Sequence, residues 1–199
     1  MTAMEQLPTH FYTVGEYAAL GETEHRTELQ EGSILMSPSP KRRHVLGVNA
    51  LAKQLEDQLP VASDLEVLTE IDLDLGLAQV DQPGTVRRPD LIVGDGVAFE
   101  RTEDAGDTMR ASDVLLVVEF VSPGSRRMDY KIKRAEYAEA GIPHYWIVDV
   151  KDPISVRVCE LTETSGYVDT GEAIGGFTTT KPFPMSIDLA GLVTRRAGG

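Results

Sequence analysis

Two acidic residues stand at the ends of short apolar segments in the middle of this chain. Asp90 directly precedes the apolar residues 91–93, and Glu119 directly follows the apolar run 114–118. Strand ends are where loops open and ligands collect in α/β sheets. Hard cations such as Mg²⁺ prefer oxygen ligands, and one or two carboxylates suffice when a substrate phosphate supplies others. We therefore expect a divalent-metal site for phosphodiester chemistry, with the Phe120 carbonyl as the third ligand.

A lysine on the next predicted element completes this chemistry. The pattern over 130–140 predicts a helix, and Lys133 lies four residues after Asp129 and four before Tyr137, so these three side chains share one helix face. An ammonium group beside a phosphate would stabilise developing negative charge or orient water. Lys131 projects about 200° away around the helix, which favours Lys133. The alternative is an exposed Asp129–Lys133 ion pair, worth only about 0.3–0.5 kcal/mol.

Two further residues are weaker candidates. His44 opens a predicted amphipathic helix over 44–59, where it could contact phosphate or act as an acid near neutral pH; a capping or surface role is the alternative. Glu28 begins a turn-like stretch that enters a strand ending near Met36, and could add another carboxylate; a solvated turn residue is the alternative. The remaining histidines lack partners at zinc-ligand spacing: His10, His25 and His144.

The predicted elements around these residues indicate a mixed α/β architecture. Continuous apolar character at 114–118 is typical of a strand covered on both faces. The helix over 130–140 is followed by an apolar strand at 145–150, so the two strands should be parallel if they share a sheet. Residues 154–161, with a turn at 165–166, predict an antiparallel extension. We expect a mixed sheet flanked by helices.

Other segments are predicted with less bearing on the site. Thr13 and Glu16 form a capping box, which predicts a short helix. Alternation over 66–75 predicts one half-buried strand. The strand that begins at Asp90 runs into a Gly-rich loop before 114, and residues 184–192 suggest a terminal helical turn.

Length and composition set the outer limits. At 199 residues and 41% hydrophobic content, the chain is expected to form one globular domain over residues 1–199. No apolar run approaches the roughly 18 residues that suggest a membrane span, no signal peptide is visible, and the single cysteine, Cys159, excludes an internal disulfide. We expect a cytoplasmic protein without a membrane partner.

The net charge of −13 opposes nucleic-acid binding on average, because Lys and Arg neutralise phosphates. The distribution softens this objection, because ten of the nineteen basic residues lie in four clusters. A local basic rim on an acidic body is one interpretation, and ordinary solvated charge is the other. The clusters are Lys41–Arg43, Arg87–Arg88, Arg126–Arg127 and Lys131, Lys133, Arg134.

Five motifs stand out along the chain: Arg26–Gly32 with His44, Pro89–Asp90, Leu116–Pro123, Asp129-x-x-x-Lys133-x-x-x-Tyr137 and Tyr145–Asp149. Together they resemble the Uma-type restriction endonuclease family of the PD-(D/E)XK nuclease superfamily. The resemblance covers roughly residues 10–195 and implies a restriction-endonuclease-like fold with Mg²⁺, for which Mn²⁺ could substitute. It implies Asp90 and Glu119 as metal ligands and Glu28 as an amino-terminal active-site acid. Val121 stands where the superfamily has a lysine, and Lys133 is implied as its replacement.

The favoured interpretation is therefore a Mg²⁺-dependent endonuclease that hydrolyses DNA phosphodiester bonds. A homodimer would suit cleavage of two strands, since symmetry then relates two sites. Two alternatives stay open. One is a non-catalytic nucleic-acid-binding or protein-binding module on the same fold, which the net charge and Val121 favour. The other is a metal-dependent phosphodiesterase acting on small molecules, for which an acidic exterior is less of a handicap.

Overall fold

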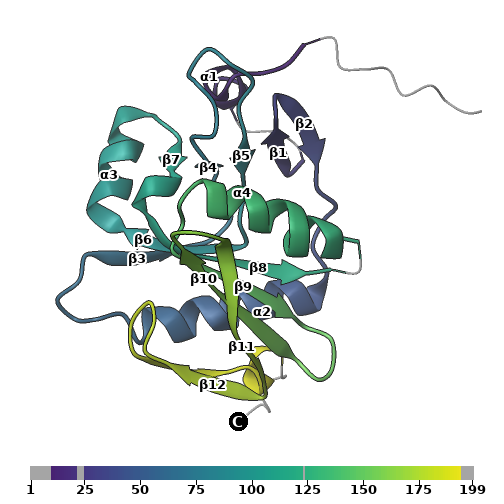
Figure 1. The fold of residues 1–199 in the computed structure, drawn as a ribbon, viewed down its shortest axis with the longest axis vertical. Coiled ribbons are helices and arrows are strands. Elements are labelled where there is room, and N and C mark those ends of the chain that lie inside the picture. The colour runs from purple at the N-terminus through teal and green to yellow at the C-terminus, as the bar shows by residue number, and fades with distance from the viewer. Residues whose placement is uncertain (1–9, 22–24, 123, 194–199) are drawn as a thin grey trace, which may run out of the picture.

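The computed structural model describes residues 10–21, 25–122 and 124–193, and a six-stranded mixed sheet forms its centre (Figure 1). The strand order in that sheet is β11-β10-β9-β8-β6-β3. Its strands are β3 (Leu65–Leu68), β6 (Leu91–Asp95), β8 (Val114–Val121), β9 (His144–Asp149), β10 (Ser155–Thr162) and β11 (Gly166–Ile174).

The three central strands confirm the predicted crossover. β8 pairs with β9 in parallel, with Glu119 opposite Ile147, and with β6 in antiparallel orientation, with Leu91 opposite Val118. The connection from β8 to β9 contains a π-helical segment, η2 (Met128–Lys133), which continues into α4 (Arg134–Glu139). Because β8 and β9 are parallel, their carboxyl ends lie at the same edge of the sheet, and the connection to η2 leaves from there.

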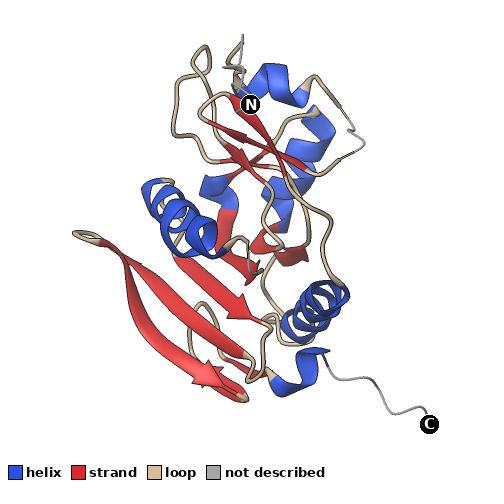
Figure 2. Ribbon diagram, turned by 90° about the vertical axis from the view of Figure 1, so that its right-hand side faces the viewer, coloured by secondary structure: helices blue, strands red, loops and turns tan. Residues whose placement is uncertain are grey.

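Alternate residues of β8 face two different helices. Leu116, Val118 and Phe120 share an apolar cluster with α2 (Arg42–Glu56), whereas Val117 and Val121 share another with Tyr137 of α4. Figure 2 shows helices on both sides of this sheet. Since side chains alternate along a strand, Glu119 points to the side on which α4 lies.

A second sheet and a hairpin complete the fold. The second sheet has the order β2-β1-β5-β4-β7, and Tyr17, Leu29 and Val86 form its small core. Its strands are β1 (Thr27–Gln30), β2 (Ser33–Met36), β4 (Leu73–Asp74), β5 (Val86–Arg87) and β7 (Met109–Arg110). The remaining elements are α1 (Val14–Ala18), α3 (Gly96–Ala105), η1 (Ala111–Asp113), β12 (Gly176–Thr179), β13 (Met185–Asp188) and η3 (Ala190–Val193).

Three predicted elements were wrong. The single strand over 66–75 is two strands in different sheets, because Glu70 adopts a left-handed conformation with φ 57° between them. The strand predicted to end near Met36 is present as β2, but Glu28 before it lies in strand β1 of a β1–β2 hairpin and not in a turn. The Gly-rich loop after β6 contains α3, whose first turn is capped by the Asp95 carboxylate.

Other predictions held in whole or in part. The Thr13–Glu16 capping box begins α1, and the helix expected over 44–59 is α2. The antiparallel extension is β10 with β11, whereas residues 184–192 form β13 followed by a 3₁₀ turn rather than a helical turn alone. The structure is a mixed-sheet α/β fold flanked by helices, as expected. Within the described residues, none of the helices combines the length and the apolar character that crossing a membrane would require.

Candidate active site

Asp90 lies one residue before β6, and every hydrogen bond it receives comes from a different element. Its Oδ2 accepts a hydrogen bond from the Phe120 backbone N–H at 2.7 Å. Its Oδ1 lies 3.1 Å from both Arg26 Nη2 and His44 Nε2. Burial alone would raise the pKa of Asp90, but His44, Arg26 and the Phe120 N–H together lower it. Asp90 is therefore an anion tied to β8, to the start of β1 and to α2.

The Glu119 carboxylate accepts hydrogen bonds from two side chains of the helical segment that follows β8. Its Oε1 accepts hydrogen bonds from Lys133 Nζ at 2.8 Å and from the Tyr137 hydroxyl at 2.7 Å. Lys133 and Tyr137 lie on consecutive turns of η2 and α4, and both are buried. The predicted helix face thus points at the second acid. Among the described residues, both side-chain hydrogen bonds of Glu119 fall on Oε1, which leaves Oε2 available to a ligand.

Glu28 is joined to the same lysine. Its Oε1 accepts from Lys133 Nζ at 2.8 Å and from the Arg88 backbone N–H at 3.3 Å, and its Oε2 accepts from Arg87 Nη1 at 3.0 Å. Arg87 is fully buried and also binds the Glu136 carboxylate of α4. Lys133 therefore bridges Glu28 of the small sheet and Glu119 of the large sheet.

The charge balance within this cluster leaves Glu119 as its least stable anion. Burial raises the pKa of Glu119 to about 8, since Asp90, Asp129 and Glu28 add to burial and outweigh Lys133. The pKa of Lys133 is raised despite its burial, because Glu119 and Glu28 favour the ammonium form. These shifts are compatible, because several carboxylates share one lysine and the surplus negative charge falls on Glu119. A bound cation would relieve that surplus.

Asp129 is a fourth buried carboxylate beside these residues. Only 3% of its surface is exposed, and its Oδ2 has no hydrogen-bond partner. Burial raises its pKa to about 6, against the Ser125 hydroxyl and Lys133. The exposed ion pair with Lys133 that sequence spacing allowed is not formed, because Lys133 donates to Glu119 and Glu28 instead.

The carboxylate and carbonyl oxygens of this site suit a hard divalent cation, although the described side chains alone do not form a complete set of metal ligands. No group of three His, Cys, Asp or Glu side chains is arranged to hold a metal ion within the residues the structure describes. Mg²⁺ commonly uses one or two carboxylates, with substrate phosphate and water for the rest. In a β-strand, the N–H and the C=O of one residue point toward the same neighbouring strand. Because the Phe120 N–H donates to Asp90, the Phe120 carbonyl is directed to the side of β8 on which Asp90 lies. Asp90, Glu119 and this carbonyl fit such an ion.

The structure brings together Glu28, Asp90, Glu119 and Lys133, and it adds His44 through Asp90. Sequence reasoning gave no individual role to Arg26 and Arg87, because only the fold places them on acids more than fifty residues away. The basic pair Arg87–Arg88 is not part of a basic rim. Arg87 is buried, and Arg88 is bound to Asp72.

Access to the carboxylates is limited in this conformation. Two surface hollows of the described chain, about 570 and 310 Å³, lie around β12–β13 and around Arg43 and Asp152, and neither is lined by a candidate site residue. Arg26 and His44 have side chains 17% and 15% exposed. These two side chains therefore form the solvent side of Asp90.

Comparison with known proteins places this chain in a family. The model of the Uma2 family, described as "Putative restriction endonuclease", matches residues 14–180. Among solved structures, the chain is similar to the crystal structure of a "putative nuclease belonging to DUF820" from Anabaena variabilis ATCC 29413. That similarity has a TM-score of 0.68 at 18% sequence identity and covers 92% of this chain and 97% of the other. No curated protein matches the chain.

Proposed function

The chain belongs to the Uma2 family, and from that premise we propose that it is a Mg²⁺-dependent endonuclease that hydrolyses DNA phosphodiester bonds. One observation supports this most strongly. Lys133 Nζ donates to Glu119 Oε1 and to Glu28 Oε1, each at 2.8 Å. A buried lysine thereby contacts Glu119 of β8, although Val121, and not a lysine, stands two residues after that acid.

Asp90, Glu119 and the Phe120 carbonyl would hold the cation. A bound Mg²⁺ or Mn²⁺ would supply an acidified water and neutralise charge at the attacked phosphate. Phe120 serves both ligands at once, because its N–H fixes Asp90 while its neighbour in sequence is Glu119. The hydrogen bond to Asp90 and the peptide bond to Glu119 together set the spacing between the two acids.

Lys133 would act as a fixed cation and not as a base. Its pKa is raised by Glu119 and Glu28, so it stays protonated at neutral pH. An ammonium held in a buried site stabilises negative charge that develops on a phosphoryl oxygen. Glu28 is a positioning residue, because its oxygens are engaged by Lys133, the Arg88 N–H and Arg87.

His44 and Arg26 would face the substrate. Burial alone would lower the pKa of His44, but its hydrogen bond to Asp90 raises it, which favours a protonated ring beside the site. Both cations would then meet a phosphate that approaches Asp90 from the solvent side. A homodimer would bring two such sites to two strands, and sedimentation with and without duplex DNA measures whether it forms.

The test is cleavage of supercoiled plasmid and single-stranded DNA with Mg²⁺ or Mn²⁺, comparing wild type with Asp90→Ala and Glu119→Ala. We expect metal-dependent nicking that both substitutions abolish. Metal binding without any cleavage, unchanged by Lys133→Ala, would favour a binding module on the same fold. Turnover of a generic phosphodiester without DNA binding at low salt would favour a small-molecule phosphodiesterase. Either result overturns the proposal.

A further inference from the structure

The basic residues that lack an ion-pair partner are unevenly distributed over this acidic chain. Within the described residues, most Lys and Arg side chains are paired with acids. Seven are exposed and unpaired. Two of them, Arg101 and Arg110, lie on α3 and β7. The other five come from three segments that meet at one edge of the large sheet: Lys41, Arg42, Arg127, Lys131 and Lys151.

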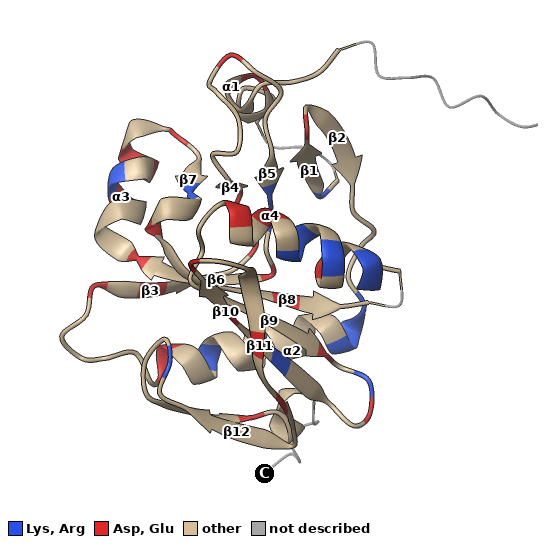
Figure 3. Cartoon of the chain, in the orientation of Figure 1, with Lys and Arg blue, Asp and Glu red and all other residues tan. Residues whose placement is uncertain are grey.

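Two ion pairs connect these three segments. Arg43 at the start of α2 binds Asp152 in the loop after β9 at 2.9 Å. Arg126, just before η2, binds Asp149 at the end of β9 at 2.6 Å. Figure 3 shows the resulting gathering of Lys and Arg along η2 and at the adjoining end of α2. We call this surface, defined by the five unpaired residues, the basic edge.

Acids do not cancel the positive charge of the basic edge. Residues 37–45, 122–134 and 149–154 contain nine Lys and Arg but only three Asp. Asp149 and Asp152 are paired with arginines, and Asp129 is buried. The edge is thus locally cationic on a chain whose net charge is −13.

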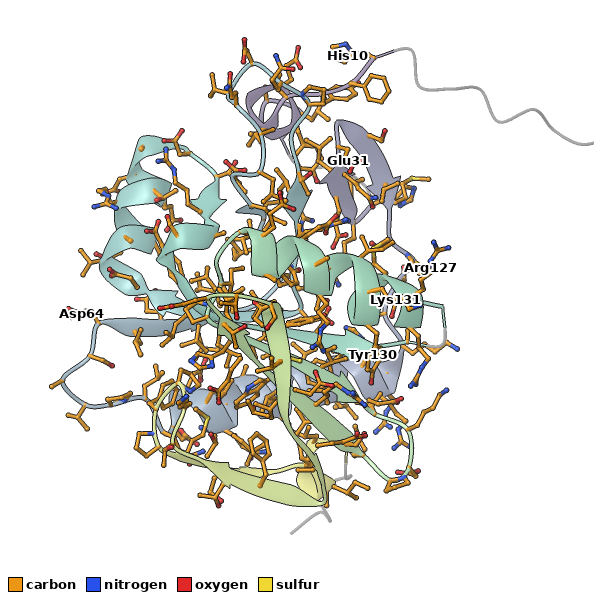
Figure 4. The ribbon with its side chains drawn as sticks, in the orientation of Figure 1. His10, Glu31, Asp64, Arg127, Tyr130 and Lys131 are labelled. Carbon is orange, nitrogen blue, oxygen red and sulfur yellow. The ribbon has the colours of Figure 1, made fainter. Side chains whose placement is uncertain are left out.

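The basic edge also borders the candidate site. His44, two residues after Arg42, lies 3.1 Å from Asp90 Oδ1. Lys133 follows Arg127 by less than two helical turns and points inward, whereas Lys131 is exposed. Figure 4 shows Arg127 and Lys131 at the same end of the η2 helix. Four of the five unpaired cations therefore lie on or beside α2 and η2, the helices that carry His44 to Asp90 and Lys133 to Glu119.

We propose that the basic edge binds the phosphate backbone of DNA on both sides of the site, and this rests on the proposed nuclease function. Binding through Lys and Arg to phosphates is independent of base sequence and weakens with salt. It also explains how an acidic protein could approach a polyanion, because Asp149 and Asp152 of this edge are paired with arginines and five cations there are unpaired.

The chain offers a matched control for the test. Arg42→Ala/Arg127→Ala removes one arginine from each side of the basic edge, and Arg101→Ala/Arg110→Ala removes two exposed, unpaired arginines elsewhere. Binding of a labelled duplex is measured by fluorescence anisotropy in EDTA across a salt series. We expect the edge variant to bind roughly tenfold more weakly or worse, with the salt slope reduced by about 2. The control variant should match wild type.

Equal losses in the two double variants would overturn the inference, since the effect would then follow net charge alone. It is also overturned if polyglutamate, at the same charge concentration, displaces the duplex as well as unlabelled DNA does. Failure of the nuclease proposal gives a different result. DNA binding would depend on the basic edge as expected, whereas wild type would leave plasmid intact with Mg²⁺ or Mn²⁺.

Discussion

At the scale of single residues, the site is a buried network in which one lysine serves two carboxylates. Glu119 and Lys133 have side chains only 4% and 7% exposed, and Glu28 6%. Removing one partner from a buried ion pair is costly, because it leaves an uncompensated charge away from water. Lys133 is therefore needed for the integrity of the site as well as for its proposed chemistry.

Lys133→Met tests the structural part of this role. It keeps a long side chain but leaves Glu28 and Glu119 without their shared cation, so we expect a loss of about 3–5 kcal/mol in the free energy of unfolding. Urea denaturation at pH 7 in EDTA measures it. Lys131→Met is the control, because Lys131 is exposed and unpaired, and it should change stability by less than about 0.5 kcal/mol. Equal stabilities for the two variants would contradict the network.

Asp129→Asn is expected to stabilise the metal-free protein. The Asp129 pKa is about 6 in the folded state and 3.8 ordinarily. An acid whose pKa is raised by folding favours the folded state in its protonated form, so this contribution is lost as pH rises from about 4 to about 6. The amide introduced by Asp129→Asn does not ionise, so the variant does not lose stability in this way as pH rises. Its advantage should be absent near pH 4 and reach at most about 3 kcal/mol at pH 8. Thermal unfolding in EDTA at both pH values measures it, and a pH-independent difference would count against it.

The sequence predicted these residues unequally. Asp90, Glu119 and Lys133 could be found because each has a local signal, a strand end or a helical spacing. The burial of Glu28 could not, because it depends on the β1–β2 hairpin and on Arg87 from β5. Such contacts are long-range, and no spacing along the chain encodes them.

At the scale of elements, the position of α2 against β8 fixes Phe120 and, through it, Asp90. Gly47 of α2 lies so close to β8 that an added Cβ would be 2.7 Å from Phe120 Cε1 and 3.3 Å from Val150 Cγ1. Gly47 thus permits α2 to pack closely against β8, and this packing also brings His44 to Asp90.

Gly47→Ala should therefore destabilise the protein, although alanine is the better helix former. We expect a cost of about 1–3 kcal/mol from overpacking against Phe120. Gly15→Ala in α1 is the matched control, because a Cβ there meets nothing within 4 Å, and it should be neutral or stabilising by up to about 1 kcal/mol. Chemical denaturation of both variants measures this. A stabilised Gly47→Ala would show that α2 is not held as described.

Elements with a strong periodic or apolar signal were predictable, and those set by local backbone exceptions were not. α2, β8 and β9 follow from their patterns. The helix α3 was missed because Gly94 and Gly96 suggest a loop, yet Asp95 caps the helix and Phe99 buries against the sheet. The break between β3 and β4 was missed because Glu70 takes a conformation that its residue type rarely adopts.

At the scale of the whole molecule, a chain of net charge −13 gathers five of the seven unpaired cations of its described residues at one edge, and the buried carboxylates of the candidate site border that edge. The buried carboxylates are held at a cost that a divalent cation would relieve. The basic edge would bring a polyanion to the same place. The two features together account for a proposed nuclease on an acidic body.

The most direct test of this account is a calorimetric titration of Mn²⁺ into metal-free protein at pH 7, in two buffers of different ionisation enthalpy. We predict one binding event, absent in Glu119→Ala. It should release protons, because Glu119, whose pKa is about 8, must lose its proton to bind metal. No binding heat in wild type, or undiminished binding in Glu119→Ala, would contradict the claim that these carboxylates form a metal centre.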